Sequence, residues 1–241
     1  MKGIISGKYT LEALEDKIGY KFNNRAFLKQ ALTHSSFANE QKINKNGNYE
    51  RVEFLGDAVL ELVSSEFLFK EHPDIPEGEL TKLRASMVCE PALAFCANDL
   101  ELKNFILLGR GEESTGGRNR DSIISDVMEA VIGAIYLDGG MEPARSFISR
   151  FILSDLEDKS LFYDSKSNLQ ELIQGKLKKE FHYELLEESG PEHDKVFQVE
   201  LFMEGESLGR GSGKSKKAAE QQAAYKALLL LRDRGYVFKK Y

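Results

Sequence analysis

The sequence predicts two domains of different fold class: an all-α domain, then a small α+β domain with the element order α-β-β-β-α. Before about residue 160, apolar residues recur three and four positions apart, and no long alternating stretch occurs. After that point, short alternating segments bounded by turn residues lie between two helical stretches. We therefore expect the all-α domain at residues 1–158, a linker at 159–165 and the α+β domain at 166–235.

The first hundred residues are expected to be helical. Two apolar sets have helical spacing: Leu11, Leu14 and Ile18, and then Phe27, Leu28, Ala31 and Leu32. After the polar loop KINKNGNY, a long helix is expected from about Glu50 to Glu71, and the prolines and glycine of HPDIPEGE end it. A further helix is expected over residues 79–97, with a kink at Pro91.

The rest of the all-α domain follows the same pattern. GRGEESTGGRNRDS is expected to form a glycine-rich polar loop. SIISDVMEAVIGAIYLDGG predicts a mostly apolar helix that stops at Gly139 and Gly140, and an amphipathic helix is expected from about Glu142 to Leu156.

The α+β domain is expected to begin with the helix SNLQELIQGKLKKEF. YELLEES, KVFQVELFME and ESLGRGSG predict three short strands. SKKAAEQQAAYKALLLLRDR then predicts a second helix, whose alanines suit close packing on a sheet.

Charge differs between the two parts, although the whole chain of 241 residues has a net charge of −6. From Ser165 onward there are 14 Lys and Arg against 12 Asp and Glu, so the acidic excess lies in the first domain. The longest apolar runs are too short to span a bilayer, and the first residues lack a secretory signal. Cys89 and Cys96 suit buried thiols in a reducing compartment. We expect a cytoplasmic protein with no membrane partner.

Acidic residues recur within the two most apolar helices. Glu50, Glu53 and Asp57 share one face of a stretch whose remaining residues, such as Phe54, Ala58 and Leu62, resemble buried core. Asp126 and Glu129 share a face of the other helix. If these faces meet, oxygen ligands without histidine or cysteine favour Mg²⁺, with Mn²⁺ as a substitute, and such sites serve phosphoryl transfer.

Simpler interpretations remain open on the pattern alone. Acids on a helix are commonly a solvated face, and Glu50 at the helix start could act on the helix dipole. His34 is expected to be a hydrogen-bonded structural residue rather than a general base. Lys82 and Arg84 are expected on a solvated face.

Several segments resemble the ribonuclease III family. ERVEFLGDAVL resembles the family signature, DVMEAVIGAIYLDGG its second acidic motif, and ALTHSSFANE and EGELTKLRASMV other family segments in the expected order. Val52 and Met128 depart from the usual residues, but both remain apolar. The resemblance implies that Glu53, Asp57, Asp126 and Glu129 bind metal and that Asp57 and Glu129 are the most critical for catalysis. It assigns Glu50 a lesser role in substrate handling or the dimer.

GRGSGKSKK does not match a nucleotide-binding P-loop, because Gly209 lies one residue late for that spacing. No nucleotide cofactor is therefore expected. We interpret the stretch as a glycine turn that opens a helix and presents lysines to phosphate. It resembles the double-stranded RNA-binding domain, which recognises the shape of the duplex. That resemblance assigns RNA contacts to Ser167, Gln170, His193, Lys214, Lys216 and Lys217.

The resulting expectation is a Mg²⁺-dependent endoribonuclease for double-stranded RNA. The family implies 5′-phosphate and 3′-hydroxyl ends with short 3′ overhangs, a twofold homodimer, and processing of ribosomal RNA precursors and other structured transcripts. The apolar residues around the acids of ERVEFLGDAVL likewise suggest that this helix packs against more than its own domain. Two alternatives are a non-catalytic double-stranded RNA-binding regulator and a redox carboxylate-bundle metalloprotein. The second usually needs Glu-x-x-His motifs, which both acidic helices lack.

Overall fold

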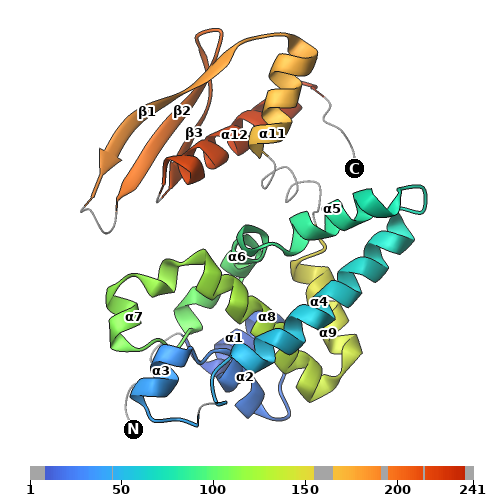
Figure 1. The fold of residues 1–241 in the computed structure, drawn as a ribbon, viewed down its shortest axis with the longest axis vertical. Coiled ribbons are helices and arrows are strands. Elements are labelled where there is room, and N and C mark those ends of the chain that lie inside the picture. The colour runs from blue at the N-terminus through green and yellow to red at the C-terminus, as the bar shows by residue number, and fades with distance from the viewer. Residues whose placement is uncertain (1–8, 45, 155–164, 191–194, 214, 237–241) are drawn as a thin grey trace. The chain divides into compact units, whose positions relative to one another are not determined.

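The computed structural model divides the chain into two compact units, Met1–Ser154 and Asp155–Tyr241 (Figure 1). The first is helical and the second combines helices with a three-stranded sheet, which confirms the predicted fold class. Within the described residues, no helix is long and apolar enough to cross a membrane. Most of the expected linker lies outside the described residues, which are 9–44, 46–154, 165–190, 195–213 and 215–236.

The first two predicted helices and the mostly apolar helix form close to their predicted places as α1, α2 and α8, and the long acidic helix is confirmed at both ends as α4. Thr10 caps the N-terminus of the first helix, where its Oγ1 accepts from the Ala13 N–H at 3.1 Å. The elements are α1 (Leu11–Ile18), α2 (Arg25–Ala31), α3 (Ser35–Glu40), α4 (Glu50–Glu71), α5 (Glu77–Val88), α6 (Glu90–Asp99), η1 (Leu102–Phe105), α7 (Arg110–Ser114), η2 (Gly117–Asn119), α8 (Asp121–Gly139) and α9 (Met141–Phe151).

Three expectations for this unit were wrong in detail. The helix expected over residues 79–97 is two helices, because Cys89 is extended (ψ 157°) and Pro91 is the second residue of α6, in the first turn, where a missing N–H costs nothing. The cysteines therefore do not share one helix. The polar loop after Gly109 contains the helical turns α7 and η2. The last helix, α9, ends at Phe151 rather than near residue 156.

α8 lies at the centre of the first unit, and α4 runs beside it (Figure 1). From residue 123 to residue 135, every side chain of α8 is buried except Asp126 and Glu129. The two backbones touch at a pair of glycines. A Cβ on Gly56 would lie 1.8 Å from the Glu129 carbonyl oxygen, and one on Gly133 would lie 2.2 Å from the Val52 carbonyl oxygen. Only glycine permits this approach.

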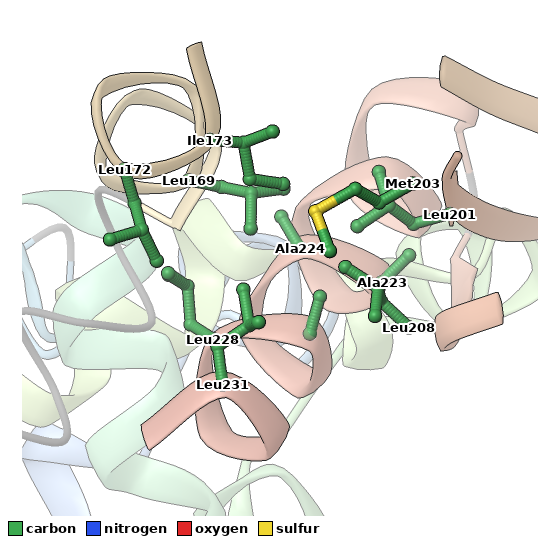
Figure 2. Close-up of a cluster of buried hydrophobic side chains, with 11 residues drawn as sticks. Leu169, Leu172, Ile173, Leu201, Met203, Leu208, Ala223, Ala224, Leu228 and Leu231 are labelled. Atoms are coloured by element: carbon green, nitrogen blue, oxygen red, sulfur yellow. The ribbon is translucent and has the colours of Figure 1, made fainter. Parts of the chain in front are cut away.

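In the second unit, helices cover one face of an antiparallel sheet of order β1-β2-β3. Leucine, isoleucine and methionine side chains from the first helix and β2 meet alanines and leucines of the last helix in the core (Figure 2). The first predicted helix continues as a π-helical turn instead of a regular α-helix. The elements are α11 (Ser165–Gln170), η3 (Glu171–Leu177), β1 (Phe181–Ser189), β2 (Val196–Met203), β3 (Glu206–Gly213) and α12 (Lys216–Asp233).

The predicted strand ESLGRGSG is confirmed as β3, so the glycines of GRGSGKSKK lie in a strand and the glycine turn also interpreted from them was wrong. Gly209, Gly211 and Gly213 alternate along the strand and face α12. A Cβ on Gly211 would lie 2.1 Å from the Ala219 carbonyl oxygen. The glycines therefore serve helix–sheet packing, and the prediction that the α12 alanines pack closely on a sheet is confirmed.

We expect Gly133→Ala to destabilise the first unit by about 2–4 kcal/mol, because the new methyl group meets backbone atoms that cannot move aside. Gly78→Ala is the control, since that helical glycine has nothing within 4 Å of an added Cβ and should gain up to about 1 kcal/mol. Denaturant unfolding of both variants measures the difference. Equal stability of Gly133→Ala and the unmodified protein would show that α4 and α8 do not meet at this glycine.

Candidate active site

The predicted acids lie where α4 meets α8. Glu53 and Asp57 are one turn apart on α4, and Asp126 and Glu129 are one turn apart on α8. The contact of Gly56 with the Glu129 backbone places the two pairs against each other. Asp57 is exposed, whereas Glu53, Asp126 and Glu129 are half-buried.

Burial disfavours the charged form of Glu53, Asp126 and Glu129, and the neighbouring acids add to this effect for the two glutamates. Burial, followed by the charges of Asp57, Glu53 and Asp126, raises the pKa of Glu129 to about 8. Burial and the neighbouring acids raise the pKa of Glu53 to about 7. Burial also raises the pKa of Asp126. A carboxyl group that titrates near neutral pH within a cluster of acids is a candidate functional group.

The four acids lack cationic partners in the described part of the chain, where no lysine or arginine forms an ion pair with them. Other acids of α4 are paired: Glu61 binds Arg84 at 2.8 Å, and Glu66 binds Arg145 at 2.5 Å. These four carboxylates, three of them half-buried, supply the oxygen ligands that a hard divalent cation prefers. Among the described residues, however, no group of three or more side chains is already gathered for a metal, so the acids form an open face rather than a closed cage.

Sequence reasoning missed Tyr49, the residue before α4. Its side chain is 5% exposed, and its hydroxyl donates a hydrogen bond to Asp126 Oδ2 at 3.2 Å. Burial and the charge of Asp126 raise the pKa of Tyr49, so the hydroxyl keeps its proton. The two residues are 77 positions apart, and the sequence carries no signal that would pair them.

The other first-unit residues considered in the sequence are exposed or have structural contacts. Glu50 is exposed at the first residue of α4, and its charge contributes to the raised pKa of Glu53. His34 Nδ1 accepts from the Ser36 N–H at 3.1 Å and so caps α3, which is a structural role. Burial lowers the pKa of His34. Lys82 is exposed, and the predicted solvated face does not hold for Arg84, because Arg84 binds α4.

Four of the six predicted RNA contacts lie on two neighbouring helices of the second unit. Ser167 and Gln170 are exposed on α11, and Lys216 and Lys217 are exposed in the first turn of α12. An ion pair between Lys166 and Glu220 joins these helices. His193 and Lys214 lie outside the described residues.

The opposite face of the sheet is acidic. Glu184 and Glu200 lie directly across from each other in β1 and β2, and Glu187 follows on the same face. Arg210 offsets part of this charge by binding Glu200 at 2.8 Å. Phosphate binding is therefore favoured on the helical side, where the exposed lysines lie.

Comparison with known proteins gives matches along most of the chain. Residues 24–156 match a family described as Ribonuclease-III-like, and residues 165–231 match the double-stranded RNA binding motif. A protein named Ribonuclease 3 from Shouchella clausii is 47% identical over 220 residues, which are 90% of this chain and 85% of that protein. A Ribonuclease 3 from Bacillus cytotoxicus is also 47% identical, over 92% of this chain and 91% of its own length.

A solved structure resembles the first unit. It is the nuclease domain of ribonuclease III from Campylobacter jejuni, described for structural flexibility in a region involved in dimer formation. It is 46% identical, has a TM-score of 0.56, and covers 59% of this chain and 96% of that chain.

We expect Glu129→Gln to stabilise the metal-free protein in a pH-dependent way. The folded wild type holds a proton on Glu129 between about pH 4.5 and 8 that the unfolded chain releases, so its stability falls as pH rises through this range. The glutamine of the variant carries no titratable proton, so the variant does not lose stability in this way, and the glutamine side chain has nearly the same shape as the glutamate. Its Tm should exceed that of the wild type by roughly 2–8 °C at pH 8.5 and by much less near pH 5.

Thermal melts across this pH range in the presence of a chelator measure the difference. Added Mn²⁺ should raise the Tm of the wild type and raise that of the variant much less, because the variant has lost one carboxylate. A Tm difference that is independent of pH would show that Glu129 is not a strained carboxylate.

Proposed function

Because this chain belongs to the ribonuclease III family, it is an endoribonuclease for double-stranded RNA, and we propose that Glu53, Asp57, Asp126 and Glu129 hold Mg²⁺ for phosphodiester hydrolysis. The observation that carries the proposal is the set of four carboxylates at the contact between α4 and α8, which form no ion pair with a described lysine or arginine. The raised pKa values of Glu53 and Glu129 mean that the metal-free protein bears an unfavourable charge cluster. A bound cation would relieve it.

We assign the four acids roles of different weight. Glu129 has the larger pKa shift of the two glutamates, and Asp57 is the first neighbouring charge that raises its pKa, so we assign the most critical roles to this pair. Enzymes of this family depend on a divalent metal ion. When bound, Mg²⁺, or Mn²⁺ in its place, would supply positive charge that offsets the carboxylates and polarises the scissile phosphodiester. The carboxylates would hold the cation for this purpose.

The second unit binds double-stranded RNA, and we assign its contacts to the two exposed helix ends. Lys216 and Lys217 lie at the start of α12, where the helix dipole also favours phosphate. Ser167 and Gln170 on α11 would reach a minor groove, and His193 and Lys214 complete the assignment. Separate contacts with two grooves match the way such modules read A-form RNA.

We also propose a twofold homodimer formed through α4. Its exposed apolar side chains recur four and seven residues apart and form one row: Phe54 is 78% exposed, Leu62 56% and Phe69 74%, and Ala58 is exposed between them. The run that resembled buried core in the sequence therefore has an exposed apolar side, and the expectation that this helix packs beyond its own domain stays a proposal. A row of this size on a helix that also bears catalytic acids favours burial against a second copy. The Campylobacter jejuni relative is likewise described with a dimer region.

A dimer would place one acidic site against each RNA strand. Cleavage of both strands would then give staggered ends, with 5′-phosphates, 3′-hydroxyls and short 3′ overhangs. We propose ribosomal RNA precursors and other structured transcripts as substrates. Two cysteines, Cys89 and Cys96, in a chain of this length suit a reducing compartment, which supports a cytoplasmic location.

Cleavage of one defined RNA duplex tests the proposed function. We expect full cleavage with Mg²⁺ and almost none with Ca²⁺, which also prefers oxygen ligands but tolerates looser coordination. Ca²⁺ should still permit RNA binding, and changing Lys216 and Lys217 to Ala should weaken that binding and reduce its salt slope by about one to two units. Duplex binding without cleavage in Mg²⁺ or Mn²⁺ would instead indicate a non-catalytic regulator.

We expect Leu62→Lys to dissociate the dimer, because twofold symmetry introduces two buried charges at once. The dimer Kd should rise by at least a hundredfold in analytical ultracentrifugation. Leu186→Lys is the matched control, since Leu186 is 42% exposed but lies in the second unit. An unchanged Kd for Leu62→Lys, or a monomeric wild type at micromolar concentration, would contradict the proposed interface.

A further inference from the structure

Asp126 is a half-buried acid that is held by a neutral hydrogen-bond donor. Its carboxylate is half-buried, and no described lysine or arginine forms an ion pair with it. The hydrogen bond from the Tyr49 hydroxyl reaches Oδ2 at 3.2 Å. A neutral donor on one oxygen leaves the carboxylate charged, and it leaves Oδ1 free to bind a cation. A lysine or arginine in the same place would compete with that cation.

Tyr49 is itself fixed by the backbone. Its N–H donates to the Thr33 carbonyl oxygen at 2.9 Å, and its carbonyl oxygen accepts from the N–H groups of Val52 and Glu53, both at 2.8 Å. The Glu53 bond is the first i to i−4 bond of α4, so Tyr49 fixes the turn that carries Glu53. One residue therefore connects the backbone of one acidic helix with a carboxylate of the other.

Thr33, whose carbonyl oxygen accepts from the Tyr49 N–H, is also held in place. Thr33 is 2% exposed, and its hydroxyl donates to the Lys29 carbonyl oxygen at 2.6 Å. Leu107 pairs with the same segment, since its N–H donates to the Leu32 carbonyl oxygen at 2.8 Å. The His34 ring lies against the Tyr49 ring, with 5.6 Å between centroids. These contacts limit the movement of the phenol ring.

We infer that Tyr49 is a positioning residue whose hydroxyl holds the Asp126 carboxylate in place relative to Glu53 and the rest of the acidic face. The inference rests on the proposed cation-binding role of that face. Residues that orient metal ligands typically contribute ten- to a hundredfold to metal affinity or activity. The hydroxyl should therefore affect cation affinity strongly, and RNA affinity and folding weakly.

The chain offers a matched control on the same helix. The Tyr20 hydroxyl donates to Asp138 Oδ2 at 2.7 Å, and Asp138 lies about 18 Å from Asp126 along α8 by the rise of an α-helix. Asp138 also accepts from the N–H groups of Asn23 and Asn24, both at 2.8 Å. Tyr20→Phe thus removes the same kind of bond, away from the acidic face and without leaving its acid unpaired.

The experiment compares Tyr49→Phe, Tyr20→Phe and the wild type in full-length protein. Mn²⁺ binding without RNA is measured by calorimetry, duplex affinity in Ca²⁺, and cleavage as a function of Mg²⁺. For Tyr49→Phe we expect about tenfold weaker Mn²⁺ binding and an equal rise in the half-saturating Mg²⁺ concentration. Its kcat at saturating Mg²⁺ should stay within about threefold of the wild type, with unchanged RNA affinity. Tyr20→Phe should retain wild-type values in all three assays.

Each other outcome decides against the inference. Wild-type Mn²⁺ affinity in Tyr49→Phe would show that the hydroxyl does not position Asp126. A Tyr49→Phe protein without a cooperative melting transition would show that the hydroxyl supports the fold. Failure of the proposed function is distinguishable, because the wild type itself would then neither bind Mn²⁺ nor cut RNA.

Discussion

The backbone contact between α4 and α8 is the constraint on which the candidate active site depends. Gly56 and Gly133 each face a carbonyl oxygen of the other helix, and neither position has room for a Cβ. This approach brings Glu53 and Asp57 against Asp126 and Glu129 while the surrounding side chains of α8 fill the core. The apolar packing of α8 must therefore offset the cost of burying the glutamates and of their repulsion, both of which raise their pKa values.

The protein treats its acids in two different ways along a single helix. Near the C-terminal half of α4, Glu61 and Glu66 are paired with arginines from α5 and α9. In its N-terminal half, Glu53 and Asp57 form no ion pair with a described lysine or arginine, and across from them on α8 the Tyr49 hydroxyl binds Asp126. A lysine or arginine paired with these acids would stabilise the fold but would compete with a cation. We propose that this part of the helix gives up such stability to leave room for a cation.

Close backbone packing recurs in the second unit for a different purpose. Glycines on one face of β3 let α12 lie directly on the strand. The helix start that carries Lys216 and Lys217 is thereby fixed on the sheet, while Ser215 Oγ caps α12 by accepting from the Ala218 N–H at 3.1 Å. In both units, glycines without room for a Cβ let two elements pack closely. In the first unit this packing brings the acids of α4 and α8 together, and in the second it fixes the lysines at the start of α12.

The sequence by itself determined both fold classes, the bounds of α4, and the two acidic faces, because helical periodicity and charge are local patterns. It predicted a strand for ESLGRGSG but also allowed a glycine turn there, and the choice between the two depends on α12 packing against the glycines. It also did not show that Phe54, Leu62 and Phe69 lie on the surface, because apolar side chains for a core and for a partner look alike. Only the tertiary structure paired Tyr49 with Asp126 and Gly56 with Glu129, because these contacts join residues far apart in the chain, and their distances follow from how whole helices pack.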